Sequence, residues 1–227
     1  MALVVIDYRK GNIRSVQKGL ELAGIEARIS EDPHEIARAS ALVLPGVGSF
    51  ADAAAFMNTS GQMQAVCDAI ARGVPFLGIC LGLHLLLEYG EEGVAQVRSR
   101  EVPGDDWACG IGAIRGHARR LKSRTPEGKQ LKVPHVGWNQ VHFASGADAG
   151  PGVLFAGIED GSNFYFTHSY EGVLANPREV FATVAHASSF PAVIGKGAAF
   201  GVQFHPEKSS HKGLKVLENF VRFVKER

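Results

Sequence analysis

The stretch Pro75-Phe76-Leu77-Gly78-Ile79-Cys80-Leu81-Gly82-Leu83-His84-Leu85-Leu86-Leu87 carries most of the structural information in this sequence. It contains a short apolar run, a cysteine between two glycines, and a second apolar run. This order predicts a buried strand, a sharp turn at Cys80 and a helix. Such a turn needs Gly78 and Gly82 because strand and helix pack closely behind the strained central residue.

Cys80 is therefore the candidate nucleophile. Its place in the first turn of the predicted helix favours the thiolate, because free backbone N–H groups and the helix macrodipole stabilise negative charge. An unpaired cysteine is more commonly a small buried hydrophobe, and the two flanking glycines are what argue against that role here. Cys67, in a predicted helix, and Cys109, in an irregular region, are expected to be structural or incidental.

The same alternation of strand and helix extends outward from this segment. Leu3–Ile6, Ala41–Leu44 and Val74–Ile79 are short uncharged runs followed by glycine-bearing turns, as in parallel strands buried on both faces. A helix is predicted from Ile13, with Gly24 as its stop. We expect an α/β fold, with an open, mostly parallel sheet flanked by helices (flavodoxin-like), in a single domain spanning 1–227.

The second half of the chain is predicted to be rich in strands because β-branched and aromatic residues are interrupted there by Gly and Pro. The predicted strands are Val141–Phe143, Asn163–Phe166, Val180–Val184, Ala192–Ile194 and Ala199–Phe204. A closing helix carries an apolar stripe from Leu214 to Val224 and is expected to be capped by Ser209 or Ser210. Ile111–Leu121 is compatible with a short strand pair, and the rest of 90–134 has no clear pattern.

Composition excludes several classes of function. The 227 residues are 45% hydrophobic and 21% charged with a net charge of +1, and the basic residues are scattered, so a nucleic-acid partner is not expected. The first residues have no basic region before a short apolar run, so we expect a cytoplasmic protein without a membrane span. The cysteine spacing fits neither a disulfide framework nor a metal site, and no cofactor or metal is expected.

A cysteine nucleophile needs a base and a group that orients the base. His205, in Gly201-Val202-Gln203-Phe204-His205-Pro206-Glu207, directly follows a predicted strand. In extended backbone, residues i and i+2 point to the same side, so Glu207 can reach one ring nitrogen while the other faces a thiolate. We predict His205 as the base and Glu207 as its orienting group.

The turn Pro45-Gly46-Val47-Gly48 also follows a predicted strand. Its glycines let backbone N–H groups face a ligand, and the tetrahedral intermediate formed by Cys80 needs two such donors. One is expected from the Gly46–Gly48 loop and one from Leu81. A phosphate-binding loop is disfavoured because no G-K-[ST] follows.

These motifs resemble those of the triad-type, class I glutamine amidotransferases. Further segments narrow the resemblance to the glutaminase subunits of imidazole glycerol phosphate synthases. They are Asp7-Tyr8 with Gly11-Asn12, Pro134-His135-Val136-Gly137-Trp138-Asn139, Tyr165-Phe166-Thr167-His168-Ser169-Tyr170 and His205-Pro206-Glu207-Lys208-Ser209-Ser210. The matches run from residue 7 to residue 210, so the resemblance covers nearly the whole chain.

The resemblance implies a glutaminase of histidine biosynthesis that forms a heterodimer with a (β/α)₈-barrel cyclase and passes ammonia to it. It implies Cys80 as nucleophile, His205 as general base and acid, and Glu207 as orienter. The Val47 amide would turn into the oxyanion hole beside Gly48 and Leu81. Substrate contacts would come from Gly46, His84 and the His168-Ser169-Tyr170 backbone, and partner contacts from Asn12, His135, Trp138 and Asn139.

Two positions depart from the family pattern. Arg9 follows Asp-Tyr where the family usually has Gly, and His84 stands four residues after the nucleophile where the family usually has Gln. An imidazole also forms hydrogen bonds, but with different reach and a pH-dependent charge. We therefore expect His84 to affect substrate affinity rather than reaction type.

Three other functions are compatible with parts of the sequence. One is a paralogous glutaminase that supplies a different barrel synthase, which Arg9 would suit. A second is a stand-alone γ-glutamyl hydrolase, which would not need Gly11-Asn12 or the Pro134–Asn139 segment. The third is a non-catalytic binding module, which the intact Cys80, His205 and Glu207 disfavour.

Overall fold

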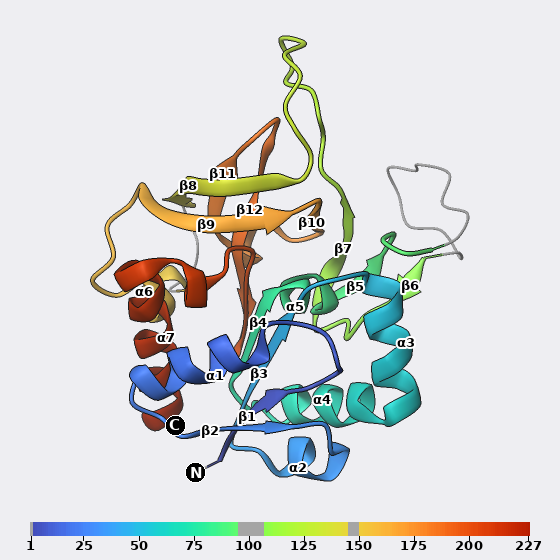
Figure 1. The fold of residues 1–227 in the computed structure, drawn as a ribbon, viewed down its shortest axis with the longest axis vertical. Helices are drawn as coiled ribbons and strands as arrows, with labels where there is room; N and C mark the ends of the chain where they lie inside the picture. Colours follow the sequence, from blue (N-terminus) through green and yellow to red (C-terminus); the bar gives the residue numbers. More distant parts are fainter. Residues whose placement is uncertain (1, 95–106, 145–149) are drawn as a thin grey trace.

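The computed structural model describes residues 2–94, 107–144 and 150–227, and its core is a nine-stranded sheet (Figure 1). In sheet order the strands are β2 (Ala27–Ser30), β1 (Leu3–Ile6), β3 (Ala41–Gly46), β4 (Phe76–Cys80), β13 (Ala199–Val202), β12 (Ser189–Lys196), β11 (Val180–Ala185), β8 (His135–Phe143) and β9 (Ser162–His168). The pairs from β2 to β13 are parallel, and those from β13 to β9 are antiparallel. The predicted α/β class is confirmed, but the central sheet is mixed rather than mostly parallel. Cys80 ends β4, one of its parallel strands.

Helices cover both faces of this sheet (Figure 1). One face carries α1 (Ile13–Leu22), α6 (Gly150–Phe155) and α7 (Ser210–Lys225), and the other carries α2 (Pro33–Arg38), α3 (Phe50–Ser60), α4 (Gln62–Ala71) and the short α5 (Leu81–Leu85). Leu3 and Val5 pack in one hydrophobic cluster, and Val4 and Ile6 in the other. Because successive side chains of a strand point to opposite faces, a strand covered on both sides is apolar throughout.

A smaller sheet adjoins the central one. Its strands are β10 (Tyr170–Leu174), β7 (Ile114–Arg120), β5 (Leu87–Gly90) and β6 (Ala108–Cys109). The segment Ile111–Leu121, whose sequence is compatible with a short strand pair, contributes the single strand β7, and the Ile111 amide before it donates to the Leu85 carbonyl at 2.7 Å. The partners of β7 come from distant segments, β5 and β10, rather than from a local hairpin. Pro103 lies outside the described residues.

The ends of the two long outer helices test the capping predictions. Helix α1 ends at Leu22, and Gly24 has a φ of +90°, as expected for a helix stop. Ser209 occupies the predicted N-cap position of α7, but its side chain makes no capping hydrogen bond. The Ser209 hydroxyl donates instead to the His205 carbonyl (2.7 Å) and accepts from the Tyr165 amide (2.9 Å). It therefore fixes the turn that follows β13 against β9. That turn contains the 3-10 helix η2 (Pro206–Lys208), and another, η1 (Pro177–Glu179), precedes β11.

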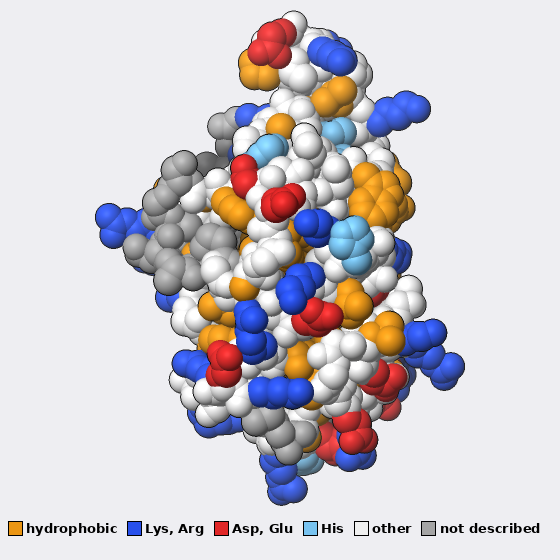
Figure 2. Space-filling view, turned by 90° about the vertical axis from the view of Figure 1, so that its left-hand side faces the viewer, with side chains coloured by type: hydrophobic (Ala, Val, Ile, Leu, Met, Phe, Trp, Pro, Cys, Tyr) orange, Lys and Arg blue, Asp and Glu red, His pale blue; other side chains and the backbone are white. Residues whose placement is uncertain are grey.

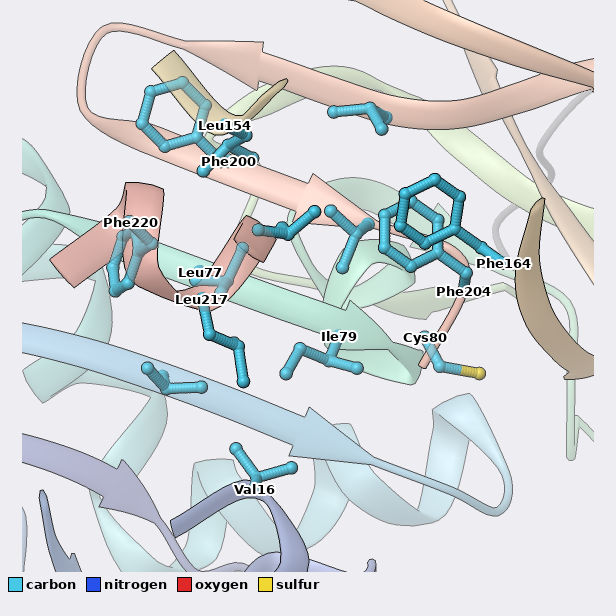
Figure 3. Packing of buried hydrophobic residues seen from close by; sticks show 14 of the residues in the cluster. Val16, Leu77, Ile79, Cys80, Leu154, Phe164, Phe200, Phe204, Leu217 and Phe220 are labelled. Atoms are coloured by element: carbon cyan, nitrogen blue, oxygen red, sulfur yellow. The ribbon is translucent and has the colours of Figure 1, made fainter. Parts of the chain in front are cut away.

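An aromatic cluster lies behind the end of β4. The Phe164 and Phe204 rings stack with their centroids 4.2 Å apart, which joins β9 to the segment after β13. Figure 3 shows these rings above Cys80, whose sulfur points away from the packed side chains. The backbone of Cys80 is therefore held by packed side chains, while its sulfur points away from them, as a reactive group requires.

Surface charge follows the composition. On the face drawn in Figure 2, acidic and basic side chains are interspersed. No helix among the described residues is long and apolar enough to cross a membrane.

Candidate active site

Strand register places three turns side by side. Strand β4 lies between β3 and β13, with Gly46 paired to Cys80 on one side and Val202 paired to Ile79 on the other. The turns after these three parallel strands therefore meet at one edge of the sheet. This is the edge where open α/β sheets bind their ligands.

The turn at Cys80 has the strained geometry predicted for it. Cys80 has a φ of +54°, which residues with side chains rarely adopt and which costs about 1–3 kcal/mol. A Cβ on Gly78 would lie 2.3 Å from the Gly82 carbonyl oxygen, and one on Gly82 would lie 1.9 Å from that of Leu44. Both glycines are therefore required by close backbone packing. Helix α5 has only five residues, so the macrodipole effect expected at Cys80 is limited to about one helical turn.

His205 and Glu207 form a buried pair. The Nδ1 atom of His205 lies 2.9 Å from Oε1 of Glu207, and both side chains are almost inaccessible to solvent. Within the described part of the chain, the other ring nitrogen, Nε2, has no hydrogen-bond partner. Burial by itself lowers the pKa of His205, but the Cys80 and Glu207 side chains together raise it to about 9. The site therefore favours an imidazolium next to the cysteine and the carboxylate.

A cavity of about 210 Å³ opens above the cysteine. It is lined by Val47, Gly48, Cys80, Leu81, His84, Glu92, Pro134, Thr167, His168, Ser169 and Tyr170. The structure thus brings the predicted oxyanion and substrate residues to one place, with one exception. Gly46 is buried and packs against Tyr8, whose hydroxyl would lie 1.9 Å from a Cβ at that position.

The histidines of the cavity are held uncharged. Burial lowers the pKa of His84 to about 4 and that of His168 to about 3, and the neighbouring His135 and His84 rings contribute to the latter. The Nδ1 atom of His168 lies 2.7 Å from the Tyr170 carbonyl oxygen. Burial also raises the pKa of Glu92 to about 7, so this carboxyl group changes charge near neutral pH.

The predicted partner-facing residues divide into two kinds. Trp138 is 55% exposed on β8, and Asn12 is exposed before α1. His135 is buried, because alternate residues of β8 face inward, and its Nδ1 lies 3.1 Å from Nε2 of His168. Asn139 donates to the Ala185 carbonyl (2.9 Å) and contacts the other nitrogen of His135 (3.2 Å). The expectation that the His135 side chain faces a partner is corrected: it links β8 to the cavity.

Three residues of the site were missed by the sequence analysis. Gln203 donates from its Nε2 to the Cys80 sulfur at 3.7 Å, Glu92 lines the cavity, and the buried Tyr8 hydroxyl lies beside Gly46. Gln203 precedes His205 by two residues, and this spacing on an extended stretch could have revealed it. Tyr8 was part of the Asp7-Tyr8 match without an assigned role, and nothing in the local sequence singles out Glu92.

Comparison with known proteins decides the family. The model of the family "Glutamine amidotransferase class-I" matches residues 4–223. The chain belongs to the class I glutamine amidotransferases. This glutamine amidotransferase is 44% identical over 223 residues to the imidazole glycerol phosphate synthase subunit HisH of Moorella thermoacetica, covering 98% of this chain and 95% of that protein. It is 40% identical over 221 residues to the HisH subunit of a Geobacillus strain, covering 97% and 96%.

Solved structures show the same fold at low sequence identity. The glutamine amidotransferase resembles a chain of the PurLQS structure from Thermotoga maritima, with a TM-score of 0.66, 17% identity and 98% of both chains covered. It resembles the glutaminase domain of Trypanosoma brucei CTPS, solved with acivicin, with a TM-score of 0.63, 12% identity and coverage of 100% and 94%. The family therefore shows a glutamine-hydrolysing enzyme, and the names of the relatives imply a subunit that works with a partner.

Proposed function

We propose that this chain is the glutaminase subunit of an imidazole glycerol phosphate synthase, which releases ammonia from glutamine at Cys80 and delivers it to a (β/α)₈-barrel cyclase. The observation that carries the proposal is the register of β4 with β13, which aligns the end of the Cys80 strand with the turn holding His205 and Glu207. The names of the relatives supply the pathway and the partner class. We treat 1–227 as one domain, because both hydrophobic clusters include residues of the same sheet.

The first half of the reaction is acylation of the cysteine. The Cys80 thiolate attacks the side-chain amide carbon of glutamine, and the N–H groups of Leu81 and the Val47–Gly48 loop receive the negative oxygen. The His205 imidazolium gives its proton to the departing nitrogen, so ammonia leaves and a thioester remains. Glu207 keeps the ring in position and stabilises its positive charge.

The second half is hydrolysis of the thioester. Neutral His205 takes a proton from water, and the resulting hydroxide attacks the thioester carbonyl through a second negative intermediate. The bond to sulfur breaks, glutamate leaves and the thiolate and imidazolium are restored. Glu92, at the cavity wall, offers a carboxylate to the substrate ammonium, while the backbone from His168 to Tyr170 binds the other end of the amino acid.

Docking is proposed to involve Asn12, Trp138 and the half-buried Asn139. An exposed tryptophan beside an exposed Val136 is suited to a protein interface. Ammonia that escapes into water is protonated and lost, so coupling hydrolysis to docking avoids wasted glutamine. His135 gives this surface a direct connection to the cavity, because it contacts both Asn139 and His168.

The test is glutamate release from glutamine by the purified chain, alone and with a cyclase subunit and its ribotide ligand. We expect strong stimulation by the liganded cyclase and its loss in Cys80→Ser. High activity of the chain alone would favour a stand-alone γ-glutamyl hydrolase. Stimulation by a different barrel synthase, but not by the cyclase, would favour the paralogous subunit, and no activity under any condition would favour a binding module.

A further inference from the structure

A buried chain of two side chains leads to the sulfur of Cys80. Nε2 of His84 lies 2.7 Å from Oε1 of Gln203, and Nε2 of Gln203 lies 3.7 Å from the Cys80 sulfur. His84 is 3% exposed and Gln203 is 0% exposed, so water does not compete for these groups. The chain runs from α5 through the turn after β13 and back to the end of β4.

The roles of donor and acceptor in this chain follow from the chemistry of the groups. His84 is uncharged at neutral pH, because burial lowers its pKa to about 4, so its ring carries one N–H. The oxygen of Gln203 and the backbone of Tyr170 both interact with this ring, and the 2.7 Å contact with the accepting Gln203 oxygen assigns the N–H to Nε2 of His84. With its oxygen engaged by His84, the Gln203 amide presents its N–H to the sulfur. The N–H of His84 thereby decides which end of Gln203 faces Cys80.

The two protonation states of the sulfur have different partners. The Thr167 carbonyl oxygen, 4.0 Å from the sulfur, accepts only from the thiol and so favours the protonated form. The Gln203 N–H, at 3.7 Å, donates to sulfur and favours the thiolate. The pKa of His205 responds to Cys80. Among the described residues, the other titratable side chains of the cavity are His84, Glu92, His168 and Tyr170, and Tyr8 interacts electrostatically with Cys80.

We propose that His84 is a positioning residue for the nucleophile: through Gln203 it directs an amide N–H at the sulfur and so favours the Cys80 thiolate. The role rests on the proposed function of Cys80. It also explains what a histidine does at position 84. Because its Nε2 is hydrogen-bonded to Gln203, His84 influences the reaction of glutamine through the reactivity of the Cys80 sulfur.

The experiment is alkylation of the full chain by iodoacetamide between pH 5 and 9, without glutamine or partner. The rate at Cys80 is read by mass spectrometry of its peptide, and the exposed Cys109 in the same molecule is the internal reference. Three variants separate the possibilities. His84→Leu removes the donor, Gln203→Met removes the amide, and His84→Gln keeps a side-chain N–H that can donate to Gln203.

We expect His84→Leu and Gln203→Met to slow alkylation of Cys80 about tenfold at pH 7 and to move the midpoint of its pH profile up by about one unit. His84→Gln should react at close to the wild-type rate, and Cys109 should not change in any variant. Thermal unfolding of each variant shows whether it is folded. If His84→Leu does not fold, the comparison of Gln203→Met with His84→Gln decides the question.

Two results would overturn the proposal. Equal slowing by His84→Leu and His84→Gln would make His84 a packing residue only. Unchanged or faster alkylation in Gln203→Met would mean that the Gln203 oxygen, rather than its N–H, faces the sulfur. Failure of the proposed function would give a different result. His84→Leu and Gln203→Met would still be alkylated more slowly than wild type and His84→Gln, but no cyclase would stimulate glutamate release.

Discussion

Oε1 of Glu207 accepts a hydrogen bond from Nδ1 of His205 at 2.9 Å. The two residues are separated by one position in the sequence, and both side chains are closed to solvent. This hydrogen bond fixes which ring nitrogen is left for Cys80. Because Nδ1 is occupied, Nε2 is the atom that exchanges protons with the sulfur and the leaving group. Glu207 therefore contributes to the reaction by orienting the ring and by stabilising its charge.

Glu207→Gln tests both contributions. The amide keeps the shape of the carboxylate but carries no charge, and its NH₂ end can hold the ring in the wrong tautomer. We expect cyclase-stimulated glutamate release to fall by about 10²- to 10⁴-fold. Glu218→Gln is the control, because Glu218 is partly exposed on α7 and, among the described residues, pairs with Lys215 on the same helix. A loss below about threefold in Glu207→Gln would contradict the assignment.

The same pair predicts a dependence of stability on alkaline pH. Cys80 and Glu207 raise the pKa of His205 to about 9 in the folded chain, against about 6.5 in an unfolded one, so His205 itself holds more proton in the folded chain between these values. This stabilisation is fully present below pH 6.5 and is lost as the pH rises through 9. Urea unfolding at pH 6, 7, 8 and 9 should show a falling free energy of unfolding in the wild type.

Glu207→Gln should make that decline shallower, because it removes a charge that raises the pKa of His205. Parallel declines in wild type and variant would show that the pair does not determine alkaline stability.

At acid pH, stability is expected to rise with pH instead of falling, and the residue responsible is His84. Burial lowers the pKa of His84 to about 4, so the unfolded chain binds the extra proton between pH 4 and 6.5. Stability is therefore complete above pH 6.5 and decreases as the pH falls. His84→Gln should reduce the pH slope of the unfolding free energy by about 1.4 kcal/mol per unit in that range. The exposed His34→Gln is the control, and an unchanged slope in His84→Gln would refute the prediction.

Gly82→Ala tests the packing behind Cys80. A Cβ there would lie 1.9 Å from the Leu44 carbonyl oxygen, and backbone cannot move away as a flexible side chain can. We expect a loss of about 3 kcal/mol in the free energy of unfolding, measured by urea denaturation. Gly152→Ala is the matched control, because no described atom outside its own helix lies within 4 Å of a Cβ there. It should not lower the free energy of unfolding and should raise it by at most about 1 kcal/mol, because alanine favours a helix more than glycine does.

Trp138→Ala tests the docking surface. Exposed tryptophans at the centre of an interface commonly contribute 2 kcal/mol or more, so we expect the dissociation constant for the cyclase to rise about 30-fold. Leu22→Ala removes an apolar side chain of similar exposure at the far end of α1 and should leave binding unchanged. Affinities are measured by calorimetry. Equal affinities of Trp138→Ala and wild type would show that the interface does not include this part of β8.

The sequence predicted the features that depend on neighbouring residues. The turn at Cys80 was foreseeable because close packing of consecutive elements permits only glycine at 78 and 82, and the structure shows the same contacts. The pairing of His205 with Glu207 was foreseeable because residues two apart on an extended stretch share a side. The parallel strands were foreseeable because strands buried on both faces are apolar throughout.

Tertiary structure alone decided which distant segments meet. That β8 turns His135 inward depends on its pairing with β9, and the alternating pattern of a strand does not name its partner. The contact of His84 with Gln203 joins residues 119 positions apart, and the Ser209 hydroxyl serves the turn at His205 rather than the helix it precedes. Local steric constraints act between residues that are adjacent in the sequence, whereas strand order and register depend on how the whole chain packs. For this reason the sequence by itself determined Cys80, His205 and Glu207, and the fold determined the distant groups that position them, such as Gln203 and Ser209.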